Sequence, residues 1–467
     1  MTVRSPLLPP MTEERARPAR TPLWQAALVF TLLVALYAAV SIQQYRRMDS
    51  FIFDLGFFES LIRDYAQGGL PELPLTDTTV ANLHFSPALA LLAPVVLVWS
   101  SPIAVLVVQA VLVAGGVVPL MRAAAPGWTA WVVAVSYGLA PGFASLIGFD
   151  FHEVALAVPL LALSMAAMVR GDHRAAVLWA LPLVLVKEDL GLTVAALGAV
   201  VFLRGSRAWG AFAMVFGAAV FVVLMAWVLP ALQPTGGFAD SYAPASASEA
   251  WRILGTGSDA KIRTVLFWLL PTGFLVLRSP MLLLVAGPTF AWRFLSDRAT
   301  YWDPWYQYDA VLVPIVVAAM IEGARALNPL PRNVGLATAL AGTLVLVPVF
   351  PFGQVWQRDF WRTPERTAAV DRVLDEIPTG SRVAASDTLG GRIALRTELY
   401  LIGDTYGYDG PAIPASEFDD VEWIAFDRRA YVPQVPAWKG FAQLLDSGDF
   451  EVVAEGGDVV VAQRVDP

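Results

Sequence analysis

Residues 23–40, LWQAALVFTLLVALYAAV, form an uncharged apolar run near the start of the chain. This run decides the fold class, because about 20 apolar residues in helical form cross the hydrocarbon core of a membrane. A signal-peptide core would be shorter and would be followed by a small-residue cleavage site, which is missing here. We therefore expect a retained membrane helix over 22–44. The polar, Pro- and Arg-rich residues 1–21 before it are expected to form a disordered cytoplasmic tail.

Similar apolar runs recur along the chain as far as residue 351. They lie at 102–121, 128–147, 153–169, 208–230, 260–278, 280–295, 309–326 and 334–351, with shorter runs at 86–100, 174–186 and 190–203. Hydrophobic residues make up 57% of the chain and charged residues only 15%, whereas soluble domains carry about 25% charged residues. The sequence therefore predicts an α-helical polytopic membrane protein, with a transmembrane domain over 22–351.

The distribution of arginine indicates the orientation, because cytoplasmic loops of membrane proteins are enriched in Lys and Arg. The residues that we assign to the cytoplasmic side are Arg4, Arg15, Arg17, Arg20, Arg122, Arg170, Arg174, Arg204, Arg207, Arg278, Arg325 and Arg332. One arrangement satisfies them all, with 86–100 in the outer interface and 174–203 folded as a short hairpin around Lys187-Glu188-Asp189. It leaves Arg46, Arg47, Arg252, Lys261 and Arg263 outside. It predicts about eleven spanning helices, a cytoplasmic N-terminus and an extracytoplasmic C-terminus.

The composition changes after residue 351, where the chain becomes polar. Period-2 patterns predict strands at 382–386, 397–402, 421–426, 450–454 and 458–464. The stretch ERTAAVDRVLDEI, after Thr363-Pro364, predicts an N-capped amphipathic helix. Residues 352–467 are therefore expected to form a small extracytoplasmic α/β domain.

Two bulk properties exclude some functions. The formal net charge of −8 provides no basic surface for nucleic acid, so no nucleic-acid partner is expected. The absence of cysteine excludes disulfides, thiolate nucleophiles and thiolate metal sites.

In the predicted topology, polar residues of several outer segments converge on one side of the membrane. They are Asp54 and His84 in the first loop, Asp150, His152 and Glu153 in the second, Lys187, Glu188 and Asp189 at the hairpin tip, and Arg293 and Arg298 in a later loop. Carboxylates beside His and Lys can act as general bases or metal ligands, and the cations can bind phosphate. The aromatic loop 301–308, YWDPWYQY, could stack against a sugar.

Each of these features also has an ordinary structural explanation. Asp54 could cap an interfacial helix, and His84 could hydrogen-bond its own loop. The DFHE stretch from Asp150 could be a helix N-cap, because acids suit helix N-termini. Lys187-Glu188-Asp189 could be a self-satisfied ion cluster, and the aromatic loop could belong to an interfacial belt. The stronger signal is that all these features lie on one side.

Four motifs, FDLGFFES, NLHFSPALALLAP, FDFHEVALAVPLLALS and LVKEDLGL, resemble the family of predicted membrane proteins called domain of unknown function 2079. The resemblance covers roughly residues 45–330, and SRVAASDTLGGRIALRTELYLI in the C-terminal domain fits as well. The layout is similar to that of GT-C glycosyltransferases, with Asp54 in place of their first acid and Asp150 or Glu153 in place of the second. His84 to Pro87 matches an H-x-P-like segment. The doubled acidic pair of some such enzymes is missing, since only Asp49 lies upstream of Asp54.

These observations favour a glycosyltransferase in the bacterial plasma membrane. It would transfer a sugar from a polyprenyl-phosphate-linked donor to an extracytoplasmic acceptor. Asp54 and Glu153 are the expected catalytic residues, and the other residues of the outer cluster would bind substrate, with Lys187, Arg293 or Arg298 on the donor phosphate. Asp54, His152 and Glu153 are the candidate ligands of a divalent cation, Mg²⁺ or Mn²⁺. The expected partners are the lipid-linked donor and membrane lipids.

Two alternatives use the same residues. A transporter or lipid flippase would employ the charges as an ion pathway, but such proteins often contain inverted repeats, and we find no internal repeat. A non-catalytic scaffold would tolerate neutralisation of the loop charges.

Overall fold

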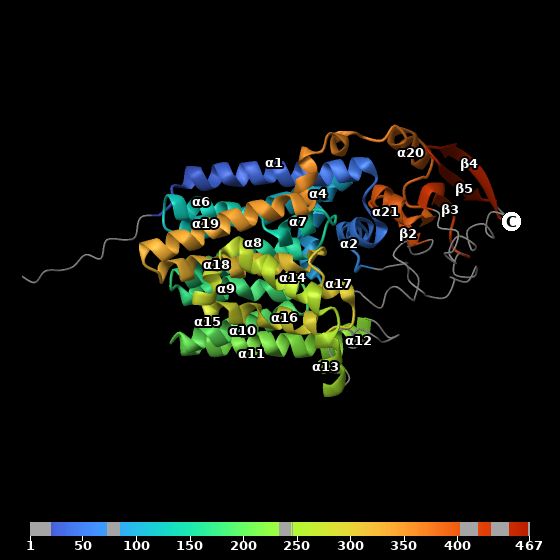
Figure 1. Ribbon diagram of the computed structural model, residues 1–467. Coiled ribbons are helices and arrows are strands. Elements are labelled where there is room, and N and C mark those ends of the chain that lie inside the picture. The colour runs from blue at the N-terminus through green and yellow to red at the C-terminus, as the bar shows by residue number, and fades with distance from the viewer. Residues whose placement is uncertain are drawn as a thin grey trace, which may run out of the picture.

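Helices dominate the described part of the chain between Leu23 and Leu346, and a small sheet domain lies at one end of the helical bundle in the computed structural model (Figure 1). The structure describes residues 20–71, 85–232, 244, 246–401, 419–430 and 448–465. All but the last two residues of the predicted tail at 1–21 lie outside these ranges.

Five helices in the described part of the chain are long and apolar enough to cross a membrane. They cover Leu23–Arg47, Pro102–Ala123, Arg207–Leu232, Ala299–Arg325 and Pro329–Val349, and the bent pair Trp128–Gly138 and Pro141–Ile147 would be a sixth. The elements within them are α1 (Leu23–Arg47), α4 (Pro102–Gly115), α5 (Val117–Ala123), α6 (Trp128–Gly138), α7 (Pro141–Ile147), α11 (Arg207–Val223), η5 (Leu224–Val228), α12 (Leu229–Leu232), α17 (Ala299–Trp302), η10 (Gln307–Leu312), α18 (Val313–Arg325), α19 (Pro329–Leu346) and η11 (Val347–Val349). The predicted number of about eleven spans is not confirmed.

Other predicted runs are present as shorter or broken helices. The shorter helical elements of the bundle are η1 (Ile52–Gly56), α2 (Phe57–Ala66), η3 (Pro87–Leu92), α3 (Ala93–Val98), α8 (Val154–Val169), α9 (His173–Ala180), η4 (Leu181–Leu185), α10 (Leu190–Leu203), α13 (Ala247–Gly255), α14 (Ser258–Leu269), η7 (Leu270–Thr272), η8 (Leu275–Arg278), α15 (Pro280–Leu283), η9 (Leu284–Ala286) and α16 (Gly287–Phe294). The expectation of one continuous helix over 260–278 was wrong. The chain breaks at Gly273 and Phe274, whose φ angles of 55° and 60° are left-handed, directly after Pro271, which cannot donate a helical hydrogen bond.

Two unusual features of the predicted topology are present. The charged triplet from Lys187 to Asp189 lies in the turn between η4 and α10, so 174–203 is a helical pair and not one helix. The segment 87–98 is helical but, at 1.5 Å per residue, is too short to cross a membrane. The break at the triplet follows from cost, because three charged side chains at the middle of a spanning helix would be expensive.

The C-terminal domain holds a five-stranded sheet in the order β2-β1-β3-β5-β4. Its elements are η12 (Pro351–Trp356), η13 (Arg358–Trp361), α20 (Thr367–Leu374), β1 (Arg382–Ala385), α21 (Asp387–Ile393), β2 (Glu398–Leu401), β3 (Trp423–Asp427), η15 (Arg428–Ala430), β4 (Phe450–Gly456) and β5 (Val459–Arg464). Strand β1 pairs in parallel with β2 and β3, and β5 pairs antiparallel with β3 and β4. Each predicted strand segment overlaps one of these strands, although β3 and β4 extend beyond the predicted ends. Helix α20 lies within the predicted amphipathic helix, but its N-cap residue is Arg366 and no described side chain caps it, so the predicted N-cap was wrong.

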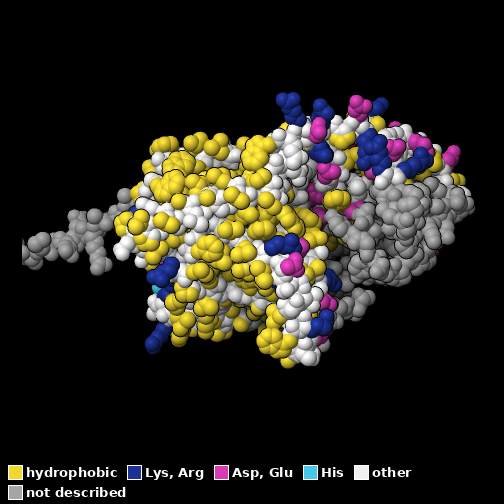
Figure 2. Space-filling view, viewed as in Figure 1, with side chains coloured by type: hydrophobic (Ala, Val, Ile, Leu, Met, Phe, Trp, Pro, Cys, Tyr) yellow, Lys and Arg dark blue, Asp and Glu magenta, His cyan; other side chains and the backbone are white. Residues whose placement is uncertain are grey.

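Apolar side chains fill the bundle and also cover its outside. One buried cluster extends through the bundle helices, while apolar residues such as Leu32, Val215 and Leu344 remain exposed. On the face seen in Figure 2, hydrophobic side chains cover the bundle, and most charged side chains gather toward the C-terminal domain. This distribution suits a bundle surrounded by lipid, because exposed apolar helix faces are stable there and costly in water.

Candidate functional site

Asp54 lies in η1, a π-helical turn between α1 and α2 at the end of the bundle that carries the C-terminal domain (Figure 1). Its Oδ1 is 3.1 Å from Nε2 of His152, which follows α7 in the chain. Both side chains are buried. A carboxylate beside Nε2 favours the tautomer with the proton on that nitrogen. The structure therefore brings together two residues from different predicted outer loops, and π-turns are frequent at functional sites.

The His152 ring is held on several sides. Phe58 of α2 lies 5.4 Å from it and Phe149 lies 5.9 Å from it, measured between ring centroids. The backbone N–H of His152 donates to Oε1 of Gln109 on α4, at 3.0 Å. No described residue hydrogen-bonds the buried Nδ1. The ring is thus fixed by packing and by Asp54, which leaves Nδ1 as its remaining acceptor.

Asp150 begins this loop in a left-handed conformation, with φ of 62°. Its Oδ1 accepts a hydrogen bond from the Ser50 hydroxyl at 2.6 Å, and its Oδ2 accepts one from the Phe51 N–H at 2.9 Å. Burial, together with the charge of Asp54, raises its pKa from 3.8 to about 8, against the opposing effect of these two hydrogen bonds. Asp150 therefore ties the loop before α8 to the segment before Asp54, and is not positioned as a simple cap of α8.

Glu153 and Lys187 form a second buried contact, with Nζ of Lys187 2.9 Å from Oε1 of Glu153. Burial alone would lower the pKa of Lys187, but the charges of Glu153, Asp189 and Glu188 outweigh it and raise that pKa above its ordinary value. Oε2 of Glu188 accepts from the Phe85 N–H at 3.0 Å. Lys187 is thus a fully charged cation in an acidic setting.

The predicted site residues Asp189, Arg293 and Arg298 each contact another residue of the protein. Asp189 accepts a hydrogen bond from the indole of Trp292 at 3.0 Å. Arg293 is fully buried, paired with Asp309 and hydrogen-bonded to the carbonyl of Tyr301. In this position Arg293 anchors the loop before α18, and no described residue hydrogen-bonds its Nη2. The side chain of Arg298 is exposed and contacts the Tyr301 hydroxyl at 3.2 Å.

The predicted cation ligands are only partly assembled. Asp54 and His152 meet, whereas the Glu153 carboxylate contacts Lys187. Among the residues that the structure describes, no group of three or more His, Asp or Glu side chains is placed to hold one metal ion. His84, the predicted partner from the first loop, lies outside the described residues.

Two acidic residues near Asp54 were not predicted as site residues. Glu59 of α2 is fully buried, and no described residue hydrogen-bonds its carboxylate oxygens. Burial, and then the charge of Asp150, raises its pKa well above the ordinary value. Asp387, in the first turn of α21, accepts a hydrogen bond from the Ile52 N–H at 2.9 Å. An acid amid the apolar residues of FFESLI was a signal for Glu59, but no local pattern marks Asp387.

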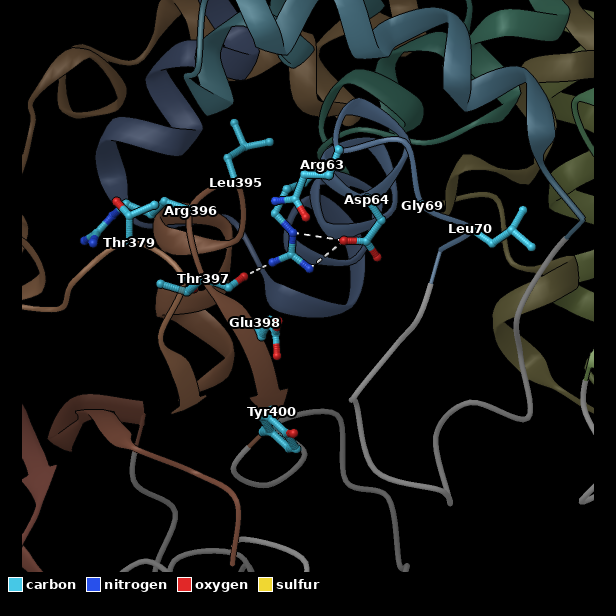
Figure 3. A pocket seen from close by; sticks show the side chains of 12 residues that line it. Arg63, Asp64, Gly69, Leu70, Thr379, Leu395, Arg396, Thr397, Glu398 and Tyr400 are labelled. Carbon is cyan, nitrogen blue, oxygen red and sulfur yellow. Dashed lines mark hydrogen bonds and ion pairs between the residues drawn. The ribbon is translucent and has the colours of Figure 1, made fainter. Parts of the chain in front are cut away.

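A cavity of about 640 Å³ lies between α2 and the C-terminal domain. It is lined by Arg63, Asp64, Gln67, Gly69, Leu70, Thr379, Gly380, Leu395, Arg396, Thr397, Glu398 and Tyr400. Figure 3 shows the guanidinium of Arg63 between Asp64 and the carbonyl of Thr397. Neither His152, which contacts Asp54, nor Glu153, which contacts Lys187, is among the residues that line this cavity.

Solved structures with a similar fold are those of ArnT from Cupriavidus metallidurans, a GT-C glycosyltransferase. The structure bound to undecaprenyl phosphate superposes with a TM-score of 0.55 and 14% sequence identity, covering 95% of this chain and 99% of that one. The apo structure gives a TM-score of 0.53 at 14% identity, covering 95% and 98%. A comparison with curated proteins finds no match. The overall fold is therefore similar in layout to that of ArnT, which agrees with the GT-C-like layout expected from the order of the outer loops.

The sequence also matches a family model over residues 44–461, which is most of the chain and includes the C-terminal domain. The model is described as "Predicted membrane protein (DUF2079)". Because the match extends well beyond the four motifs that indicated it, the chain belongs to this family of predicted membrane proteins, domain of unknown function 2079.

Proposed function

We propose that this protein is a glycosyltransferase of the bacterial plasma membrane, which transfers a sugar from a polyprenyl-phosphate-linked donor to an extracytoplasmic acceptor. The observation that carries the proposal is the contact between Asp54 and His152. It lies at the end of a bundle whose fold resembles that of ArnT, which was solved with undecaprenyl phosphate. The N-terminus would be cytoplasmic and the C-terminal domain extracytoplasmic, as the arginine distribution indicates.

In this proposal Asp54 is the general base. It takes the proton of the acceptor hydroxyl while that oxygen bonds to the anomeric carbon of the donor sugar. The bond from the anomeric carbon to the phosphate oxygen breaks, and the electron pair leaves with polyprenyl phosphate. His152 would orient Asp54 and the acceptor, since its Nε2 faces the carboxylate. A positioned base of this kind contributes about 10²- to 10⁴-fold to a rate.

Lys187 is the cation that we assign to the donor phosphate. Its charge is secured by the acidic residues around it. Lys187 contacts Glu153 at 2.9 Å, and a donor phosphate oxygen would take the place of that carboxylate. Glu153 would then be released to act on the acceptor, while Glu188 and Asp189 keep the hairpin tip in place through Phe85 and Trp292. Arg298, which is exposed, is a second cation for the phosphate.

Dependence on a divalent cation enters the proposal only as a separate arm of the experiment, in which turnover is compared with and without the cation. The Glu153 carboxylate contacts Lys187, and among the described residues no three His, Asp or Glu side chains are grouped to hold one ion. The roles given above to Asp54 and Lys187 require no metal-dependent step.

The test is turnover by purified protein in lipid nanodiscs supplied with a panel of polyprenyl-phosphate sugars, with and without Mg²⁺ or Mn²⁺. We expect at least one donor to be consumed by the wild type and not by Asp54→Asn. If no donor binds and none is consumed, the proposal fails, and transport of a lipid or ion by the same acidic and basic residues becomes the leading alternative.

A further inference from the structure

The segment that carries Asp54 is held at its beginning by two carboxylates from distant parts of the chain. The Phe51 N–H donates to Asp150 at 2.9 Å, and the next N–H, that of Ile52, donates to Asp387 at 2.9 Å. The first N–H groups of a helical segment have no partner within it, so an acidic side chain there stabilises the turn. Asp150 belongs to the bundle and Asp387 to the C-terminal domain. The position of η1 is therefore set jointly by both domains.

Two glycines of α21 make this approach possible. A Cβ at Gly390 would lie 2.3 Å from Cγ1 of Ile52, and a Cβ at Gly391 would lie 3.1 Å from the Leu55 side chain. Ile52 and Met48 are also buried in the same apolar cluster as Val370, Leu389 and other residues of the C-terminal domain. The backbone of α21 is thus seated directly on the residues on either side of Asp54.

Hydrogen bonds also join the C-terminal domain to α1 and α2 around the contact between α21 and η1. Nη2 of Arg392 donates to the carbonyl of Tyr45 at 2.8 Å, and the Thr367 hydroxyl donates to the carbonyl of Arg46 at 3.1 Å. On the other side, Nη1 of Arg63 donates to the carbonyl of Ala394. It also donates to the carbonyl of Thr397 (Figure 3). The C-terminal domain therefore contacts the end of α1 and Arg63 of α2, in addition to η1 between them.

We propose that Asp387 is a positioning residue for Asp54, and that the candidate site is complete only when the C-terminal domain is seated on η1. Asp387 acts through the Ile52 N–H, two residues before Asp54, and needs no contact with substrate. This inference rests on the proposed function for its catalytic consequence, because a displacement of about 1 Å can cost 10²-fold in rate. It goes beyond the proposed function by assigning the C-terminal domain a part in the site.

The first test does not depend on activity. Hydrogen–deuterium exchange is followed in peptides covering residues 48–60 of full-length protein in nanodiscs. Asp387→Ala removes the acceptor of the Ile52 N–H, so we expect exchange there to become about tenfold faster or more. Asp387→Asn keeps an acceptor oxygen and should exchange like the wild type. Glu455→Ala on β4, which breaks an exposed ion pair between Glu455 and Arg428, is the control. Wild-type exchange in Asp387→Ala would overturn the proposal.

The second test measures whether the contact between α21 and η1 affects turnover of the donor that the wild type consumes. We expect Asp387→Ala to lower kcat about tenfold or more at a nearly unchanged donor KM, and Asp387→Asn to restore most of it. Faster exchange with unchanged kcat would show a cap without a positioning role and would overturn the inference. If the wild type consumes no donor, the proposed function fails, whereas the exchange result still decides whether Asp387 holds η1.

A disulfide cross-link between η1 and α21 tests whether holding these two segments together restores the turnover lost in Asp387→Ala. The chain has no cysteine, and a Cβ at Gly391 would lie 3.3 Å from Cβ of Leu55, close to the 3.5–4.5 Å of a disulfide. Leu55→Cys with Gly391→Cys is therefore introduced into Asp387→Ala. Oxidation should hold α21 of the C-terminal domain against η1 and raise kcat severalfold over the kcat of the reduced form of the same protein. Equal turnover in the oxidised, cross-linked and the reduced protein would contradict the proposal.

Discussion

Nε2 of His152 lies 3.1 Å from Oδ1 of Asp54, although one residue follows the bent pair α6–α7 and the other follows the first helix. The pair is buried beside Phe58 and Phe149, and the segments that carry it are held together by Asp150. This contact joins two loops that the sequence places on the same side of the membrane. It is the geometric centre of the predictions that follow.

Asp54→Asn should reduce sugar transfer about 10²- to 10⁴-fold, the usual contribution of a general base, while leaving donor affinity nearly unchanged. The measurement is initial-rate kinetics in nanodiscs with the donor that the wild type consumes. Asp49→Asn is the matched control, because Asp49 lies in the same segment but is exposed and paired with Arg47. Full activity in Asp54→Asn would remove Asp54 from the mechanism.

Lys187→Met should destabilise the protein by about 3–5 kcal/mol, because it leaves the buried carboxylate of Glu153 without its cation. Adding Glu153→Gln should recover part of this loss. Thermal unfolding in detergent measures both, and Arg263→Gln, which breaks an exposed pair with Asp259, should leave Tm unchanged. If Lys187→Met unfolds at the wild-type temperature, the Lys187–Glu153 pair is not a buried structural contact.

Stability should depend on pH through Asp150, whose pKa is raised from 3.8 to about 8 by burial and by Asp54. A raised acid pKa means that the unfolded chain loses its proton first, so this group's contribution to stability falls as pH rises between those two values. Asp150→Asn imitates the neutral acid. Its Tm relative to wild type should rise from pH 5 to pH 8, equivalent to about 1 kcal/mol per pH unit. A constant difference across this range would show that Asp150 is ionised throughout.

Gly390→Ala should destabilise the seat of the C-terminal domain by about 1–3 kcal/mol, the usual cost of overpacking. The new Cβ would overlap the side chain of Ile52, which η1 holds in place. Gly115→Ala on α4 is the control, since a Cβ there meets no atom within 4 Å. Limited proteolysis of the C-terminal domain and thermal unfolding report the effect. Equal protease resistance in both variants would mean that α21 can shift away from η1 at no cost.

Much of the architecture was predictable because its signals are local. The length and apolar composition of 23–40 determine a spanning helix by themselves. The charges of Lys187, Glu188 and Asp189 determine a break, since burying them in mid-membrane would cost too much. Alternating patterns likewise located the five strands. The break at Gly273 and Phe274 was missed because an apolar run shows hydrophobicity but not backbone conformation.

The sequence by itself thus determined the membrane class, the helical break at the charged triplet, the strands of the last domain and the set of polar residues in the outer loops. Only the tertiary structure decided which of them meet. It paired Asp54 with His152 and Glu153 with Lys187, enclosed Arg293 against Asp309, and placed Asp387 on the Ile52 N–H. The physical reason is the separation along the chain over which each kind of interaction acts. Hydropathy and strand periodicity act over a few neighbouring residues, whereas these contacts join segments that are separated by whole helices or by a domain and meet only when those pack together.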